Sequence, residues 1–267
     1  MAKIGNSSPP SPADPLGQRL ANWLRFLAET TGATTAQTTP TTGQTFLAKL
    51  PESAGRAHTE HSDQGLSEVD GRLPAPGNCV LPGSFAPLHH GHLEMAKLAM
   101  SKLPQPAIEN PAIGKPAIPK PAFGSGSRHC WFEICIANVD KPPLDLQMIL
   151  DRIQQDFGGF GVLLSNAPTF EEKSQLFPGV TFAVGADTIR RICKLKYYEN
   201  NQARFEQAIA SIKSNGNRFL VFGRIEDGEF LESEQLDLPA SVSELCEFVS
   251  SQEFRIDISS SEIRNDQ

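Results

Sequence analysis

The sequence predicts an α/β protein built on a doubly wound parallel sheet. Short apolar runs of strand length alternate with segments in which apolar residues recur at helical spacing. Capping signals mark several helix starts between these runs, and 267 residues are enough for one sizeable domain. Strands that alternate with helices imply a parallel sheet with right-handed crossovers, which is a Rossmann-like arrangement.

Charge and cysteine content limit the classes of partner. The 24 Lys and Arg against 31 Asp and Glu give a net charge of -7, so no overall positive field would hold a long nucleic acid. The five scattered cysteines lack zinc-site spacing and predict reduced thiols. The first 30 residues lack a basic head followed by an apolar run, and no 18 consecutive residues are apolar. We expect a soluble, cytoplasmic protein with no nucleic-acid partner and no membrane attachment.

Residues 1–77 form a low-complexity extension that we expect to be largely disordered. They are rich in Thr, Ser, Pro, Gln and Gly, and so contain too little apolar area to offset the entropy of ordering. One amphipathic helix is predicted at about 14–30, with Asp14 as its N-cap and Pro15 at its first position. Its apolar face carries Leu16, Leu20, Leu24 and Leu27. This helix would either dock on the main domain or bind a separate partner.

The main domain, 78–267, opens with a strand and then a helix whose apolar positions run from Leu93 to Leu103. The insertion at 104–127 repeats Pro-Ala-Ile and Pro-Ala-Phe units, which favour an extended solvent loop over a docking motif for a proline-recognising partner. Further strands are predicted at 131–138, 161–166, 180–185, 218–225 and 253–259. Helices are predicted at 144–157, 187–196 and 202–213, and from the capping boxes Thr169–Glu172 and Ser241–Glu244.

The segment GSFAPLHHGH, residues 83–92, directly follows the first predicted strand. Gly83 would let the backbone come close to a phosphate, and His89 and His92 share a face at a helix start. Two imidazoles beside a helix N-terminus make a site for an anion. We therefore expect this loop to bind phosphate groups.

Two further segments end predicted strands of the same sheet. In ISSSEIR, residues 258–264, three serine hydroxyls and exposed amides precede Arg264 and form either a second phosphate cradle or an ordinary serine cap. In VGADT, residues 184–188, Asp187 either faces a ligand or is a plain N-cap. Ligands of such sheets bind beyond the carboxyl ends of the strands. Asn138 and Lys141 follow another strand, where Lys141 would neutralise a phosphate of the ligand unless this is a solvated turn.

Together these motifs resemble those of the HIGH-motif nucleotidyltransferase superfamily. GSFAPLHHGH is similar to its signature GxFxPxHxGH, and ISSSEIR is similar to its ISSTxIR motif. The Gly-Ala-Asp at 185–187 resembles a segment of nicotinamide mononucleotide (NMN) adenylyltransferases. His89 disfavours the phosphopantetheine adenylyltransferases, and Pro87 with ISSSEIR disfavours the cytidylyltransferases, so the NMN adenylyltransferases are the best fit.

The resemblance implies transfer of a nucleoside monophosphate, AMP from ATP in the best-fitting members, onto a phosphate-bearing acceptor such as NMN, with release of pyrophosphate. His89 and His92 would be catalytic, and Asn138 and Lys141 would bind the acceptor. The nucleotide would contact Gly83, Ser84, Phe85, Gly91, Gly185, Asp187, Ser259, Ser260, Ser261 and Arg264. Mg²⁺ would be held mainly by triphosphate oxygens and water, without a protein ligand cluster.

Other functions remain open at this point. A cytidylyltransferase is the alternative among enzymes. A nucleotide-binding regulator or scaffold without turnover is the alternative from another class, with the N-terminal helix and the proline-rich insertion as interaction elements. A class I aminoacyl-tRNA synthetase also carries a HIGH motif, but no lysine loop resembling KMSKS is visible here.

Overall fold

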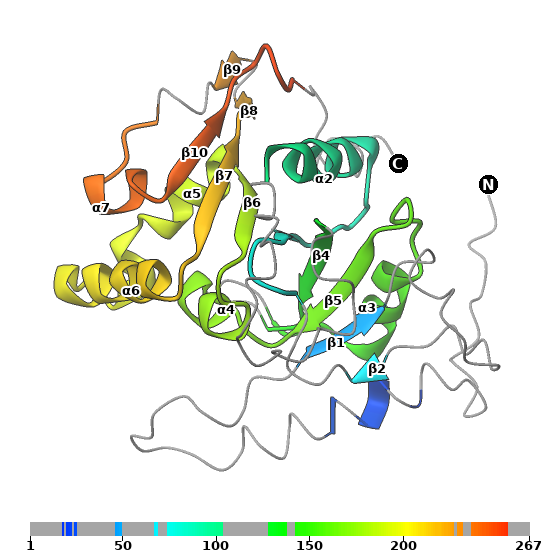
Figure 1. Cartoon of the computed structure of the whole chain (residues 1–267). Helices are drawn as coiled ribbons and strands as arrows, with labels where there is room; N and C mark the ends of the chain where they lie inside the picture. Colours follow the sequence, from blue (N-terminus) through cyan, green and yellow to red (C-terminus); the bar gives the residue numbers. More distant parts are fainter. Residues whose placement is uncertain are drawn as a thin grey trace, which may run out of the picture.

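The computed structural model describes residues 18, 20–22, 24–25, 46–49, 67–68, 74–103, 128–137, 142–226, 229–231 and 236–255. The predicted insertion at 104–127, the acceptor residues Asn138 and Lys141, and the ISSSEIR segment lie outside these residues. The described part shows one large sheet covered by helices (Figure 1).

Six parallel strands form the centre of the sheet, in the order β10-β7-β6-β3-β4-β5. Their bounds are β3 Cys79–Pro82, β4 Cys130–Cys135, β5 Gly161–Ser165, β6 Thr181–Gly185, β7 Arg218–Phe222 and β10 Cys246–Val249. From β3 the chain winds outward through β4 and β5, then returns beside β3 and winds the other way through β6, β7 and β10. This order confirms the predicted doubly wound sheet and places its switch point between β3 and β6.

Two short strands from before residue 74 extend this sheet, which the sequence analysis did not predict. β1, Phe46–Lys49, pairs antiparallel with β5, and β2, Ser67–Glu68, pairs antiparallel with β1. An edge strand draws stability from backbone hydrogen bonds to its neighbour, so four residues in a Thr-rich stretch carry little pattern of their own. Leu20, in the predicted N-terminal helix, is fully buried in the core cluster that Leu24 also contacts. That helix therefore contacts the main domain.

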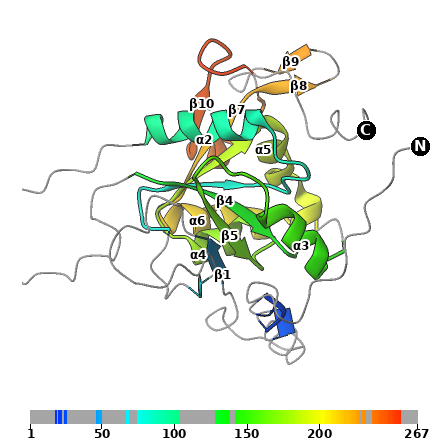
Figure 2. The ribbon, with the colours of Figure 1, turned by 90° about the vertical axis from the view of Figure 1, so that its right-hand side faces the viewer.

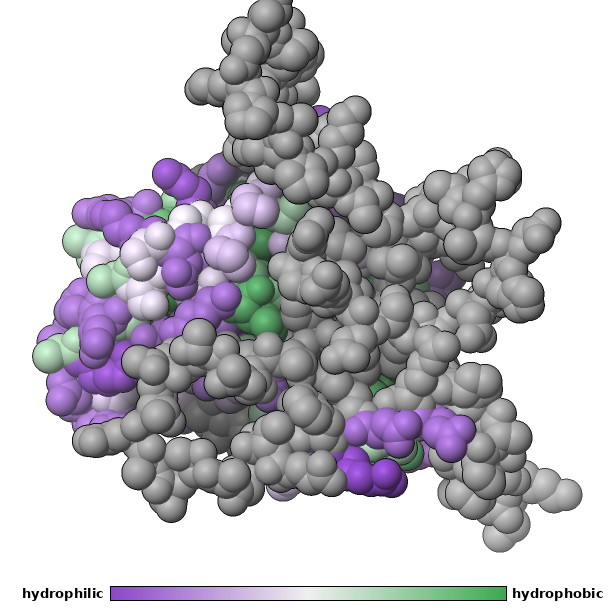
Figure 3. Space-filling view, turned by 60° about the horizontal axis from the view of Figure 1, so that its bottom comes forward, coloured by the Kyte–Doolittle hydropathy of each residue, from purple (hydrophilic) through white to green (hydrophobic). Residues whose placement is uncertain are grey.

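The helices cover both faces of the sheet, with α2 on the opposite side from α4 and α6 (Figure 2). α2 and α3 contribute buried residues to one core cluster, and α5, α6 and α7 contribute buried residues to the other. The bounds are α2 His90–Lys102, α3 Leu146–Ile153, α4 Phe170–Leu176, α5 Ala186–Ile192, α6 Gln202–Ser214 and α7 Ala240–Ser243, with a 3-10 helix at Leu195–Tyr198. The described surface seen in Figure 3 is mainly hydrophilic, as solvent-facing helix sides require.

Helix starts follow local capping chemistry. The predicted capping box of α4 is confirmed, because the Glu172 N–H donates to Thr169 Oγ1 at 3.2 Å and the Thr169 N–H donates to Glu172 Oε2 at 2.9 Å. α3 begins at Leu146, later than predicted, because Asp145 is its N-cap and accepts from the Met148 N–H at 2.7 Å. The predicted capping box at Ser241 is wrong, since α7 starts at Ala240 after Pro239.

The C-terminal half differs from the prediction in three places. The last strand in the described part of the chain is β10, Cys246–Val249; residues 253–255 of the predicted strand at 253–259 are not in a strand, and 256–259 lie outside the described residues. The predicted strand at 218–225 ends at Phe222; β8, Arg224–Glu226, pairs instead with β9, Glu229–Leu231, in a separate hairpin. The predicted helix at 187–196 is divided into α5 and the 3-10 helix. Each boundary depends on pairing or packing partners that local periodicity does not reveal.

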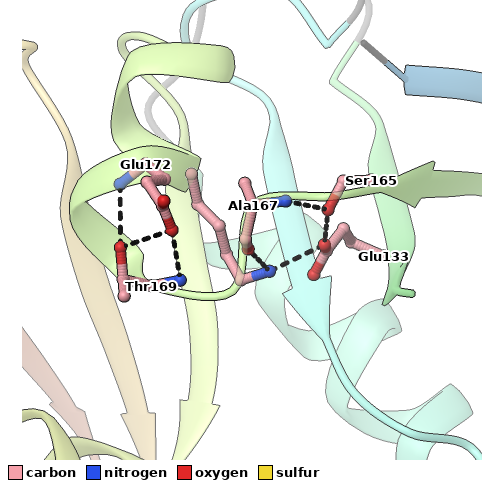
Figure 4. A network of polar contacts seen from close by, with 6 residues as sticks. Glu133, Ser165, Ala167, Thr169 and Glu172 are labelled. Atoms are coloured by element: carbon pink, nitrogen blue, oxygen red, sulfur yellow. Dashed lines mark hydrogen bonds and ion pairs between the residues drawn. The ribbon is translucent and has the colours of Figure 1, made fainter. Parts of the chain in front are cut away.

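A buried ion pair joins the centre of the sheet to α4 (Figure 4). Lys173 Nζ lies 2.7 Å from Glu133 Oε1 and donates to the Ala167 carbonyl at 2.7 Å, and both side chains are at most 5% exposed. The Ser165 hydroxyl donates to the same Glu133 oxygen. Such a pair is stable only while each charge keeps its partner, because desolvation of a lone charge is expensive.

We expect Glu133→Ala to lower the free energy of unfolding by about 3–5 kcal/mol, because it leaves the Lys173 ammonium buried without its carboxylate. Replacing both members, Glu133→Leu with Lys173→Met, should recover much of this loss. Urea unfolding measures both effects. The exposed pair Lys213–Glu244 is the control, and Lys213→Met should change little. A Glu133→Ala protein that unfolds at the wild-type urea concentration would contradict the expectation.

Candidate active site

Two predicted segments meet at the switch point of the sheet. The loop at 83–89 leaves the carboxyl end of β3, and residues 185–187 lie at the carboxyl end of β6. β3 and β6 are hydrogen-bonded neighbours and run parallel, so both segments start from the same edge of the sheet. Ligands of doubly wound sheets bind at this point, where the chain departs in opposite directions.

Phe85 anchors the loop. Its ring is 1% exposed and packs edge-to-face against Phe132, Phe157 and His92 at centroid distances of 5.2, 6.0 and 5.1 Å. A Cβ on Gly83 would lie 2.5 Å from this ring, so only glycine leaves room for it. Phe85 itself has a φ of 44°, a conformation that a bulky residue keeps only when its surroundings hold it. Gly83 and Phe85, both predicted as nucleotide contacts, thus also determine the shape of the loop.

Gln155 forms hydrogen bonds to the same loop, and no motif in the sequence predicted this contact. Its Oε1 accepts from the Leu88 N–H at 2.7 Å, and its Nε2 donates to the Phe85 carbonyl at 2.7 Å. Gln155 follows α3, which ends at Ile153, whereas the prediction placed it inside a longer helix. No sequence signal distinguishes it from its neighbour Gln154.

The two predicted catalytic histidines lie together at the start of α2. His89 is the N-cap with extended backbone, and the His92 N–H donates to the His89 carbonyl at 3.0 Å. In return the His89 N–H donates to His92 Nδ1 at 3.3 Å. The two rings are 3.8 Å apart between centroids and inclined by 31°. The backbone of the helix start thus orients both imidazoles side by side.

Both imidazoles favour the neutral form. Burial, with a smaller effect of the neighbouring His89, lowers the pKa of His92 from 6.5 to about 3. Burial and the neighbouring His90 lower the pKa of His89. Because Nδ1 of neutral His92 accepts the His89 N–H, its proton resides on Nε2. That arrangement leaves His92 with one N–H donor for an anionic ligand.

The Gly-Ala-Asp segment begins the helix after β6. Gly185 is the N-cap of α5, so the interpretation of Asp187 as a plain N-cap is wrong. Asp187 lies in the first turn, and a Cβ on Gly185 would be 2.8 Å from its Oδ1. Glycine here therefore makes room for the carboxylate at the edge of the switch point.

The remaining predicted nucleotide contacts of the loop differ in exposure. Ser84 is exposed, whereas Gly91 is buried as the second residue of α2. Within the described part of the chain, no group of three or more His, Cys, Asp or Glu residues is arranged to hold a metal ion. None of the helices described there is long and apolar enough to cross a membrane.

The turn after β10 connects the site to the chain that leads into ISSSEIR. Lys102, at the end of α2, forms a 2.6 Å ion pair with Glu253. Phe254 packs edge-to-face on Phe222, the last residue of β7, at 5.0 Å between centroids. The chain that precedes residues 258–264 is thus tied both to the helix that carries His92 and to the carboxyl end of β7.

The lowered pKa of His92 has a consequence for stability. Between pH 6.5 and about 3 the unfolded chain binds a proton at this residue and the native protein does not, so native stability is lost as pH falls. We expect His92→Gln to flatten part of the decline in unfolding free energy between pH 7 and pH 4. The exposed Ser84 is the control, and Ser84→Ala, which changes no titratable group, should keep the wild-type slope. Equal slopes in all three proteins would count against a neutral, buried His92.

We expect Gly83→Ala to lower stability by about 1–3 kcal/mol, because the new methyl group overlaps the buried Phe85 ring. Urea unfolding measures the loss. The control is Ser84→Ala at the exposed next position, which should unfold like the wild type. If the two variants have the same stability, the ring does not determine the need for glycine.

Comparison with known proteins identifies the family of the chain. A family model described as cytidylyltransferase-like matches residues 80–266. No curated protein matches the chain. A solved structure, Plasmodium falciparum nicotinic acid mononucleotide adenylyltransferase complexed with APC, is 14% identical and aligns over 70% of this chain and 82% of its own with a TM-score of 0.34. The family model spans well over half of the sequence, including the loop at 83–92 and the segment at 258–264. The chain therefore belongs to the cytidylyltransferase-like family of nucleotidyltransferases.

Proposed function

We propose that this protein transfers AMP from ATP onto the phosphate of a small acceptor, of which NMN is the best candidate, and releases pyrophosphate. One observation carries the proposal: His89 and His92 lie side by side, with lowered pKa values, at the N-terminus of a 13-residue helix at the switch point. A helix N-terminus adds its own attraction for phosphate.

The reaction needs no proton transfer. An anionic oxygen of the acceptor phosphate attacks the α-phosphorus in line, and a new P–O bond forms as the bond to the α,β-bridging oxygen breaks. The electron pair of the broken bond leaves with pyrophosphate. Negative charge grows on the oxygens around the α-phosphorus, and donors already oriented toward those oxygens lower the barrier. Neutral imidazoles suit this role, since they donate a hydrogen bond without giving up a proton.

His92 is the stronger candidate for the donor. The His89 N–H holds its Nδ1, which leaves Nε2–H for the nucleotide. Protonation of the ring would remove the acceptor at Nδ1 and disturb the start of α2. A bound triphosphate, which is strongly anionic, would favour the protonated form and raise the pKa of His92 toward its ordinary value.

The other expected contacts complete the proposal. Ser259, Ser260, Ser261 and Arg264 would hold the β and γ phosphates. The packing of Phe254 on Phe222, at the carboxyl end of β7, supports their placement at the edge of the sheet from which the loop starts. Asp187, in the first turn after β6, would contact the ribose region.

The remaining components are the acceptor side of the site and the metal. Asn138 and Lys141 would bind the acceptor phosphate beyond β4, the strand next to β3. Mg²⁺ would be bound mainly through triphosphate oxygens and water. Pro87 together with ISSSEIR favours adenylyl over cytidylyl transfer through the resemblance to the nucleotidyltransferase motifs.

Pyrophosphate release with ATP, Mg²⁺ and NMN tests the proposal. We expect His92→Ala, and to a similar degree His89→Ala, to lower kcat by roughly a hundredfold to a thousandfold, because each removes a donor to the developing charge. His90→Ala, between them and exposed, is the matched control and should keep wild-type activity. Removal of Mg²⁺ with EDTA should abolish turnover.

Parallel assays separate the alternatives. Nicotinic acid mononucleotide in place of NMN tests the acceptor, and CTP in place of ATP tests the nucleotide. Turnover with CTP and not ATP would overturn adenylyl transfer. Nucleotide binding without turnover on any acceptor would identify a regulator instead of an enzyme.

A further inference from the structure

Gln155 lies outside the sequence motifs but forms two hydrogen bonds to the loop at 83–89 that leads to the histidines, called here the histidine loop. It lies 67 and 70 residues from its partners Leu88 and Phe85, so the contact is tertiary. The side chain is partly buried and uses both ends of its amide, at 2.7 Å each. A third hydrogen bond, from Nε2 to the Arg152 carbonyl at 3.0 Å, holds the amide against the last turn of α3.

The two loop contacts bracket the turn that presents the histidines. Phe85 lies before the turn at 86–87, and Leu88 directly precedes His89. The loop offers one carbonyl and one N–H to Gln155, so a side chain must both donate and accept to satisfy both. Phe157, from the same turn as Gln155, packs its ring on Phe85. The turn after α3 therefore contacts the loop through both an aromatic ring and an amide.

We propose that Gln155 is a positioning residue for the transfer reaction, which it serves by clamping residues 85–88 so that His89 and His92 face the nucleotide. This inference rests on the proposed function. Gln155 contacts backbone atoms only, so it acts through the loop. Misplacement of a catalytic group by about 1 Å is enough to cost on the order of a hundredfold in rate.

The chemistry of the clamp provides a specific signature in Gln155→Glu. An ionised carboxylate accepts from the Leu88 N–H but cannot donate to the carbonyls of Phe85 and Arg152. A protonated carboxyl has one donor and restores a loop bond. Partial burial and two facing carbonyl oxygens raise the pKa of such a carboxyl. The activity of Gln155→Glu relative to wild type should therefore rise as pH falls.

A comparable amide lies at the opposite end of the strands. Asn217 Nδ2 donates to the carbonyls of Phe177 and Val180 at 2.8 and 3.1 Å, at the amino end of β6 and β7. Like Gln155 it bridges two backbone groups with one amide, but the edge it braces is opposite the histidine loop. Asn217→Ala and Asn217→Asp should therefore lower the stability of the protein, as the Gln155 variants do, but leave the geometry of residues 85–88 unchanged.

The experiment compares Gln155→Leu, Gln155→Glu and the two Asn217 variants in the full chain. At a temperature where all are folded, kcat of Gln155→Leu should fall by roughly tenfold to a hundredfold, with a smaller change in KM for ATP, because the histidines act mainly in the transition state. Asn217→Ala should stay near wild type. Between pH 8 and pH 6, the ratio to wild type should rise for Gln155→Glu and not for Asn217→Asp.

A second measurement does not depend on activity. Hydrogen exchange of the Leu88 amide, measured by NMR, should be faster in Gln155→Leu than in wild type and unchanged in Asn217→Ala. Unchanged exchange, or pH ratios that are parallel for the Glu and Asp variants, would overturn the clamp. If exchange is faster in Gln155→Leu but the wild-type protein transfers no AMP, the clamp is upheld and the proposed function is overturned.

Discussion

The burial of Phe85 is the constraint on which the geometry of the site depends. Its ring fills the space next to Gly83 and packs against the rings of Phe132 and Phe157. The loop after β3 is therefore anchored in the core at Phe85, a few residues before His89. A loop without such an anchor would be free to sample many conformations, and the histidines would reach one orientation only part of the time. Core packing thus sets the orientation of the two histidines in the absence of a ligand.

Sheet topology then decides which segments share that site. Because β3 and β6 are neighbours at the switch point, segments separated by about one hundred residues start from the same edge. The buried pair of Glu133 and Lys173 fixes α4 against the strand beside β3, and the Glu133 carbonyl accepts the Gly83 N–H at 2.9 Å. One residue of β4 therefore stabilises both the sheet interior and the first residue of the histidine loop.

The electrostatics of the site follow from burial more than from formal charge. The protein is acidic overall, with a net charge of -7, yet the proposed substrates carry several negative charges. Neutral imidazoles and backbone amides at the start of α2 offer hydrogen bonds to phosphate without a strong permanent field. Such donors gain strength in a partly desolvated environment, where water does not compete for the same oxygens.

Local sequence pattern by itself determined the alternation of strands and helices, the loop and helix that carry His89 and His92, and the capping box at Thr169, because each depends on residues close together in the chain. Tertiary structure alone decided the rest. β1 depends on pairing with β5 and β2 on pairing with β1, the end of α3 allows Gln155 to reach the loop, and β10 forms beside β7 at residues where no strand was predicted. Gly83 shows both contributions: its place in the motif was legible from the sequence, but the reason that the fold needs glycine there is a ring that only packing brings above it.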